Sequence, residues 1–181
     1  MADELEILKL VAERLDTAGV RYMLSGSMAI SFYAQPRMTR DIDIVVELDV
    51  GDAGRLASLF VADFYCEVDA VRDAAERRGV FNIIHNETIV KVDFIVRKDS
   101  PYRAEEMRRR RLVDAGGARI WLVAPEDLLL SKLYWAKDSR SEVQLRDVRN
   151  LIASQAGLDW AYIRAWAQEL SVSALLDEVR T

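Results

Sequence analysis

The segment from Asp41 to Glu47, with the sequence DIDIVVE, constrains the fold more than any other stretch of the chain. Successive side chains of a β-strand point to opposite faces, so Asp41 and Asp43 would share one face. The opposite face would be apolar and formed by Ile42, Ile44 and Val46. The segment therefore predicts a strand with one face packed on a hydrophobic core and two aspartates on the other face.

The rest of the chain mixes strand patterns with helical patterns. Strands are predicted at 20–24, 64–68 and 119–123, with a hairpin whose arms are 80–85 and 88–96. Helices are predicted at 4–18, 28–34 and 52–62, in a charged segment ending near 78, and at 126–137, 141–154, 158–169 and 172–180. This order predicts an α+β fold with a core over residues 1–124 and a C-terminal helical part over residues 125–181. The boundary is soft, and the two parts can equally form one compact domain.

Bulk composition narrows the class of protein. The formal net charge of the 181 residues is -5, which excludes a strongly basic nucleic-acid-binding coat. The single cysteine, Cys66, cannot form an internal disulfide, so we expect a reducing cytoplasm. The first residues do not have the pattern of a secretory signal, and no apolar run approaches the roughly 20 residues that a membrane span needs. We therefore expect a cytoplasmic protein with no membrane partner.

A Gly-Ser pair precedes the two aspartates. Thirteen residues separate Ser27 from Asp41, and Gly26-Ser27 lies between a predicted strand and a predicted helix. Such a turn directs backbone N–H groups and the Ser27 hydroxyl toward a polyphosphate. Asp41 and Asp43 would have β-carbons roughly 6–7 Å apart, which suits two divalent cations about 3.5–4 Å apart. Asp93, on the strand KVDFIV, would be the third carboxylate.

These motifs resemble the nucleotidyltransferase superfamily with a DNA polymerase β-like palm. The resemblance is carried by Ser25-Gly26-Ser27, by TRDIDI at 39–44 and by KVDF at 91–94. The helical segments PEDLLLSKLYWAK at 125–137 and LRDVRNL at 145–151 resemble, less specifically, the abortive-infection and toxin-type branch. The resemblance implies a mixed palm sheet, an NTP substrate and transfer of a nucleoside monophosphate to a hydroxyl of an RNA end, a protein or a small molecule. It also implies a possible role as a toxin with an antitoxin protein as partner.

The same resemblance implies roles for individual residues. Asp41, Asp43 and Asp93 would be catalytic and would bind two Mg²⁺ ions, with Mn²⁺ as an alternative metal. The nucleotide would be bound by Gly26, Ser27, Arg40 and Lys132. Lys132 has apolar helical neighbours, so it either extends past a packed face or points at the triphosphate. Arg40 and Arg37 can instead pair with surface acids. In LRDVRNL, Asn150 replaces the acidic residue that many members of the branch carry.

Two other interpretations of the chain, and the role of one basic segment, stay open. The chain can be an inactive nucleotide-binding module of the same fold, or a structural α+β domain with a fortuitous motif. The basic run Arg108–Arg111 is either a solvated face or a surface that steers an RNA acceptor. The tryptophans of the C-terminal half are expected to pack helices rather than stack bases, and they are Trp121, Trp135, Trp160 and Trp166.

Overall fold

A seven-stranded mixed sheet forms the centre of the molecule in a computed structural model that describes residues 2–180. The strand order is β3-β4-β5-β2-β1-β7-β6. The strands are β1 (Tyr22–Ser25), β2 (Asp41–Val46), β3 (Phe64–Tyr65), β4 (Val80–His85), β5 (Lys91–Val96), β6 (Arg111–Asp114) and β7 (Arg119–Leu122). Strand β2 lies in the middle of the sheet, antiparallel to β1 and parallel to β5. The predicted α+β fold with a mixed sheet is confirmed.

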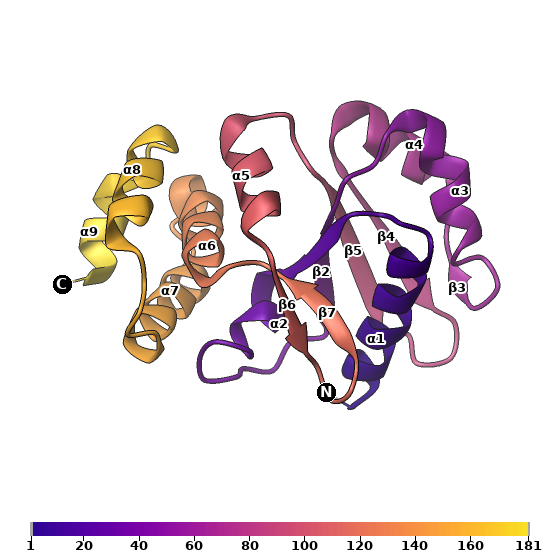
Figure 1. The fold of residues 1–181 in the computed structure, drawn as a ribbon, viewed down its shortest axis with the longest axis horizontal. Coiled ribbons are helices and arrows are strands. Elements are labelled where there is room, and N and C mark those ends of the chain that lie inside the picture. Colours follow the sequence, from indigo (N-terminus) through magenta and orange to yellow (C-terminus); the bar gives the residue numbers. More distant parts are fainter. Residues whose placement is uncertain (1, 181) are drawn as a thin grey trace.

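Helices surround this sheet. The first half of the chain contributes α1 (Ala2–Thr17), α2 (Gly26–Ile30), the 3-10 turn η1 (Val50–Asp52), α3 (Ala53–Ser58) and α4 (Val68–Arg77). The second half contributes α5 (Pro101–Arg109), α6 (Pro125–Ser139), α7 (Glu142–Ser154), α8 (Trp160–Glu169) and α9 (Ser173–Arg180). Figure 1 shows α1, α3 and α4 gathered on one side of the molecule and α6 to α9 on the other.

One face of the central strands is fully apolar, as the alternation in β2 predicts. Ile42 and Ile44 of β2 and Phe94 of β5 are each 0% exposed. Phe60, in the turn after α3, packs on Phe94 with ring centroids 5.7 Å apart. This face packs on the first-half helices and belongs to a hydrophobic core that extends to buried residues of α6 and α7, such as Leu129 and Leu151. The polar side chains of β2 and β5 remain on the opposite face.

Several elements differ from the predictions. The segment 97–118 contains α5 and the edge strand β6, neither of which was predicted. Helix α2 begins at Gly26 and not at residue 28, so the Gly-Ser pair lies inside its first turn. The second hairpin arm starts at Lys91, because residues 86–89 form the turn and Ile89 takes a positive φ of 58°. Strand β3 has only two residues.

No helix among residues 2–180 combines the length and the apolar character needed to cross a membrane.

Candidate active site

The three aspartates predicted from the sequence lie on two neighbouring central strands. Because β2 and β5 are parallel and in register, Asp43 lies directly opposite Asp93, and Asp41 lies opposite Lys91. Asp43 and Asp93 are partly buried and line a common cleft. The side chain of Asp41 is 54% exposed. The sheet register thus brings Asp43 and Asp93 together and leaves Asp41 more exposed to solvent.

Asp43 is affected by its burial and by the neighbouring carboxylate of Asp93. Burial raises the pKa of Asp43, and the negative charge of Asp93 raises it further. The backbone N–H of Ser27 donates a hydrogen bond to Asp43 and acts in the opposite direction on that pKa. An arrangement of like charges in a partly desolvated cleft is stabilised when a cation neutralises it.

Lys91 provides a cation that contacts two of the three carboxylates, those of Asp93 and Asp41. Its Nζ lies 2.8 Å from Asp93 Oδ2 and 3.5 Å from Asp41 Oδ1. Within residues 2–180, no group of three or more His, Cys, Asp or Glu side chains converges in the way a metal ion requires. Carboxylate oxygens are nevertheless the ligands that Mg²⁺ prefers, and the ammonium of Lys91 is itself a cation standing between two of them. The donor chemistry of Asp41, Asp43 and Asp93 therefore suits a divalent cation, although their three carboxylates do not converge on one point in this structure.

The Gly-Ser turn approaches Asp43 so closely that only glycine fits. Gly26 follows β1, in which Ser25 lies opposite Asp43. Gly26 adopts a φ of +62°, and a Cβ added there would lie 1.9 Å from Asp43 Oδ2. Both the left-handed backbone and the contact with the carboxylate exclude a side chain at this position. The backbone at Gly26 therefore approaches the Asp43 carboxylate closely.

Two further cations are fixed beside this turn by one buried acid, Asp147 of α7, which is 1% exposed. Lys132 Nζ lies 2.8 Å from Asp147 Oδ2 and 3.0 Å from Gln144 Oε1. Arg37 Nε lies 3.1 Å from Asp147 Oδ1, and Arg37 Nη2 donates to Ser27 Oγ. A continuous chain of hydrogen bonds thus runs from the Gly-Ser turn through Arg37 and Asp147 to Lys132.

The two cationic residues that the sequence predicts as nucleotide ligands, Lys132 and Arg40, lie in different surroundings. Lys132 is 3% exposed and lines the cleft, and burial lowers its pKa. Arg40 is exposed and is not part of the cleft lining. The arginine beside the Gly-Ser turn is Arg37, for which the sequence suggested a pairing with a surface acid. Its partner is instead the buried Asp147. The sequence signal of Arg37 was only its position between the two motifs.

The cleft has a volume of about 330 Å³ and is lined by residues of the sheet, α2, α6 and α7. Trp135 lines it and is 59% exposed, so the expectation that the tryptophans pack helices is wrong for Trp135. The remaining lining residues are Ser25, Gly26, Ser27, Asp43, Val80, Asp93, Ile95, Leu128, Ser131, Lys132 and Gln144.

The basic run Arg108–Arg111 is engaged within the protein. Arg109 donates to Asp127 and to Glu126, both at 2.9 Å. Arg108 pairs with Glu105, and Arg110 donates to a backbone carbonyl while stacking over Trp121. These arginines mainly join α5 to α6 and to the edge of the sheet.

This sheet, with a Gly-Ser turn and facing aspartates beside it, defines the nucleotidyltransferase fold, and comparison with solved structures agrees. A nucleotidyltransferase-like protein of Paracoccidioides brasiliensis superposes with a TM-score of 0.66 at 21% identity, over 98% of this chain and 88% of that one. The antibiotic-resistance factor ANT(2'')-Ia superposes with a TM-score of 0.59 at 12% identity, over 99% of both chains. The lincosamide antibiotic adenylyltransferase LnuA superposes with a TM-score of 0.52 at 16% identity, over 78% of this chain and 91% of that one.

No family model matches the sequence, and no curated protein matches it significantly. The likeness to these distant structures therefore shows a shared fold.

Proposed function

We propose that this protein is a metal-dependent nucleotidyltransferase that transfers a nucleoside monophosphate from an NTP to a hydroxyl acceptor. The observation that carries the proposal is the convergence of two motifs in one cleft. Asp43 and Asp93 face each other across β2 and β5, and the Gly26-Ser27 turn abuts Asp43. Structures with the same fold include the lincosamide antibiotic adenylyltransferase LnuA, which supports the reaction class.

The three aspartates would hold the metal. Bound Mg²⁺ would neutralise phosphate charge and lower the pKa of the acceptor hydroxyl. Asp43 would be a ligand held in place by the Ser27 N–H, and Asp41 would extend the site toward solvent. Asp93 would also accept the proton of the attacking hydroxyl on a carboxylate oxygen. Pyrophosphate would leave as the new phosphodiester bond forms.

Lys132 and Arg37 would bind the triphosphate. Both cations are held by Asp147, and Arg37 is joined to the Gly-Ser turn through Ser27. Such pre-organised donors need little rearrangement when they bind an anion, which is favourable for electrostatic stabilisation. In this proposal Asp147 is a positioning residue, because it acts on phosphate only through the two cations.

The acceptor would approach from a wider groove beside the cleft. This groove has a volume of about 790 Å³ and passes along α5, α6 and the β4–β5 strands. It shares with the cleft the five lining residues Ser25, Val80, Ile95, Ser131 and Trp135. The shared wall would allow a hydroxyl in the groove to reach the carboxylates.

A second candidate is an inactive module that binds nucleotide without turnover. The observation that favours it is Lys91, whose ammonium contacts Asp93 and Asp41 where a metal would bind. A role as a toxin neutralised by an antitoxin protein stays a prediction from the sequence resemblance, as does an RNA acceptor.

Label transfer tests the enzyme proposal. The protein would be incubated with each α-labelled NTP, Mg²⁺ and, in separate reactions, total RNA, a protein extract and small-molecule hydroxyl compounds. We expect Mg²⁺-dependent label on one acceptor class, lost in Asp43→Asn and in Asp93→Asn. Asp138→Asn, an exposed residue of α6, is the matched control and should keep the activity. NTP binding without label on any acceptor would favour the inactive module.

A further inference from the structure

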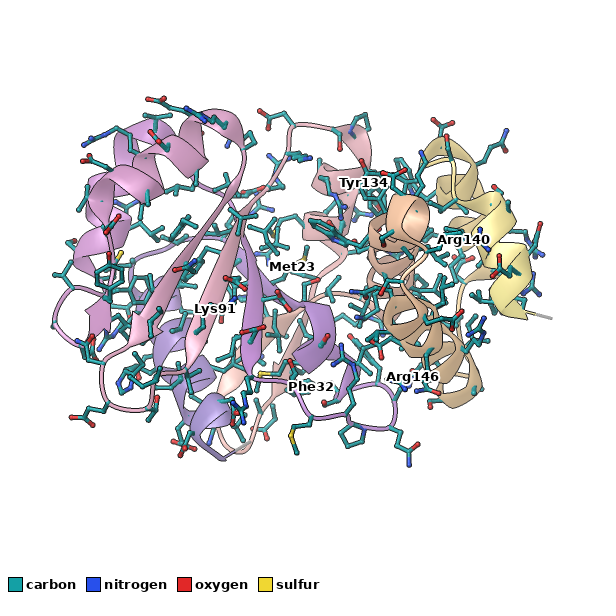
Figure 2. The ribbon with its side chains drawn as sticks, turned by 180° about the vertical axis from the view of Figure 1, so that it is seen from behind. Met23, Phe32, Lys91, Tyr134, Arg140 and Arg146 are labelled. Carbon is teal, nitrogen blue, oxygen red and sulfur yellow. The ribbon has the colours of Figure 1, made fainter. Side chains whose placement is uncertain are left out.

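Lys91 lies at the centre of the carboxylate site although the metal-binding pattern does not include it. It shares a face of β5 with Asp93, two residues further along, and it lies opposite Asp41 in the parallel register. Figure 2 shows Lys91 on the central strands, away from Tyr134 and Arg146 on the flanking helices. The sheet register therefore fixes the ammonium of Lys91 beside the two carboxylates.

The other cations of the site are committed elsewhere. Lys132 and Arg37 are both paired with Asp147 on α7. Among residues 2–180, the ion pairs of Asp41 and Asp93 are made by Lys91 alone. Lys91 is thus the resident counter-ion of the two carboxylates.

The pairing with Lys91 is also easily reversed. The side chain of Lys91 is 38% exposed and that of Asp41 is 54% exposed, whereas that of Asp93 is 20% exposed, so the ammonium is open to solvent although one of its partners is partly buried. Ion pairs that solvent can reach are screened and contribute little to stability. A divalent cation that brings further ligands besides the carboxylates and water can displace the ammonium of Lys91. A divalent cation whose only other ligands are water molecules must compete with this ammonium for the carboxylates.

We propose that Lys91 occupies the place of a divalent cation in the nucleotide-free protein, so that the metal enters together with the NTP and not before it. This inference rests on the proposed function. Mg²⁺ in phosphoryl-transfer sites is held by one or two carboxylates together with substrate phosphates. The phosphates add the ligands that offset the loss of the Lys91 pairs, so NTP and metal bind cooperatively.

A purely structural role for Lys91 makes a different prediction. If the ion pairs only strengthened the pairing of β2 with β5, then removing the ammonium would lower the stability of the sheet and leave metal affinity unchanged. Metal affinity in the absence of nucleotide therefore distinguishes the two roles, and it does not require the acceptor or any turnover.

The test is calorimetric titration of Mn²⁺ into the full chain, with and without a non-hydrolysable NTP analogue. The variants are Lys91→Met, Lys91→Gln and Lys91→Arg, and Lys9→Met on α1 is the control because Lys9 pairs only with Glu6. We expect Lys91→Met and Lys91→Gln to bind Mn²⁺ about tenfold more tightly than the wild type without nucleotide. Lys91→Arg and Lys9→Met should resemble the wild type, and the analogue should reduce the difference between variants.

Two outcomes overturn the inference and can be told apart. Equal Mn²⁺ affinity in the wild type, Lys91→Met and Lys91→Gln without nucleotide, with metal-dependent analogue binding retained, would refute the role of Lys91 and leave the proposed function standing. Absence of Mn²⁺ binding in every variant, even with the analogue, would refute both. Thermal melts of each variant show that it is folded, and the Gln variant repeats the test if the Met variant is not.

Discussion

At the scale of single residues, Asp147 connects parts of the chain that the sequence keeps far apart. It lies on α7, and it pairs with Lys132 on α6 and with Arg37 in the loop before β2. A buried carboxylate requires partners, and two cations share this one. The ion pair with Asp147 therefore explains how the ammonium of Lys132 can be buried beside the cleft, with the residue only 3% exposed.

Substitution of Gly26 tests the contact between the turn and the carboxylate. Gly26→Ala should lower the affinity for Mg²⁺-NTP by at least about tenfold, because the new Cβ must displace Asp43. Gly19→Ala is the matched control, since Gly19 has a φ of +68° and an added Cβ would meet nothing within 4 Å. Both variants should lose about 1 kcal/mol of unfolding free energy through the left-handed backbone. Calorimetric titration of NTP measures the difference, and equal affinities in the two variants would contradict the account.

Substitution of Lys132 separates packing from phosphate binding. Lys132→Met should weaken Mg²⁺-NTP binding by about tenfold or more, because a charge-assisted contact to phosphate is lost. Lys137→Met, on the exposed side of the same helix, should leave NTP affinity unchanged. Titration of NTP into both variants gives the measurement. An NTP affinity in Lys132→Met equal to that of the wild type would assign Lys132 to packing.

The sequence predicted the part of the site that depends on local geometry. The alternation in DIDIVVE and in KVDFIV is enough to place Asp41, Asp43 and Asp93 on one face of two strands. The meeting of Arg37 with Asp147 could not be predicted, because 110 residues separate them and the contact depends on how α7 packs. Arg40, and not Arg37, was predicted as a nucleotide ligand. Which of the two arginines reaches the cleft depends on the conformation of the loop before β2, and local sequence patterns do not determine that conformation.

At the scale of elements, α5 is joined to α6 by hydrogen bonds between Ser131 and the buried ion pair that Arg103 and Glu106 form within α5. Arg103 Nη1 lies 2.8 Å from Glu106 Oε2 and 2.7 Å from Ser131 Oγ of α6. Glu106 is 1% exposed although α5 is polar along most of its length. A helix held by such pairs lacks the apolar periodicity that sequence analysis searches for. The sequence feature that indicates the start of α5 is Ser100 followed by Pro101, which form an N-cap and a proline in the first turn.

Asp127 makes this layer of helices sensitive to pH. It is 0% exposed, it accepts from Tyr162 Oη at 2.6 Å and from Arg109 Nε at 2.9 Å, and burial raises its pKa to about 6. The unfolded value is about 3.9, so between about pH 6 and pH 4 the folded state binds a proton that the unfolded state does not. The contribution of Asp127 to the unfolding free energy therefore grows as pH falls through 6 and is lost as pH rises.

Asp127→Asn removes that dependence. Between pH 7 and pH 4.5, the unfolding free energy of the wild type should gain about 2 kcal/mol relative to Asp127→Asn. Urea denaturation of both proteins at both pH values provides the comparison. Asp138→Asn, exposed on the same helix, should differ from the wild type equally at the two pH values. A wild-type advantage over Asp127→Asn that does not change with pH would show that Asp127 stays charged throughout this range.

At the scale of the whole molecule, the cleft takes residues from both halves of the chain. Asp43 and Asp93 come from the sheet and Gly26 from α2, whereas Lys132 and Gln144 come from α6 and α7. The sequence motifs predicted the sheet half of this cleft and the presence of the helices. The assembly of the two halves depends on tertiary packing, which local patterns do not encode. We therefore expect residues 1–124 and 125–181 to act together in nucleotide binding.

The central claim is that Asp43 and Asp93 form a metal-dependent NTP site. It is tested most directly by calorimetric titration of each NTP into the wild type and into Asp43→Asn, with and without Mg²⁺. We predict that one or more NTPs bind the wild type only when Mg²⁺ is present, and that this binding is lost in Asp43→Asn while the variant keeps its thermal melt. NTP binding that is independent of Mg²⁺, or that survives in Asp43→Asn, would contradict the account.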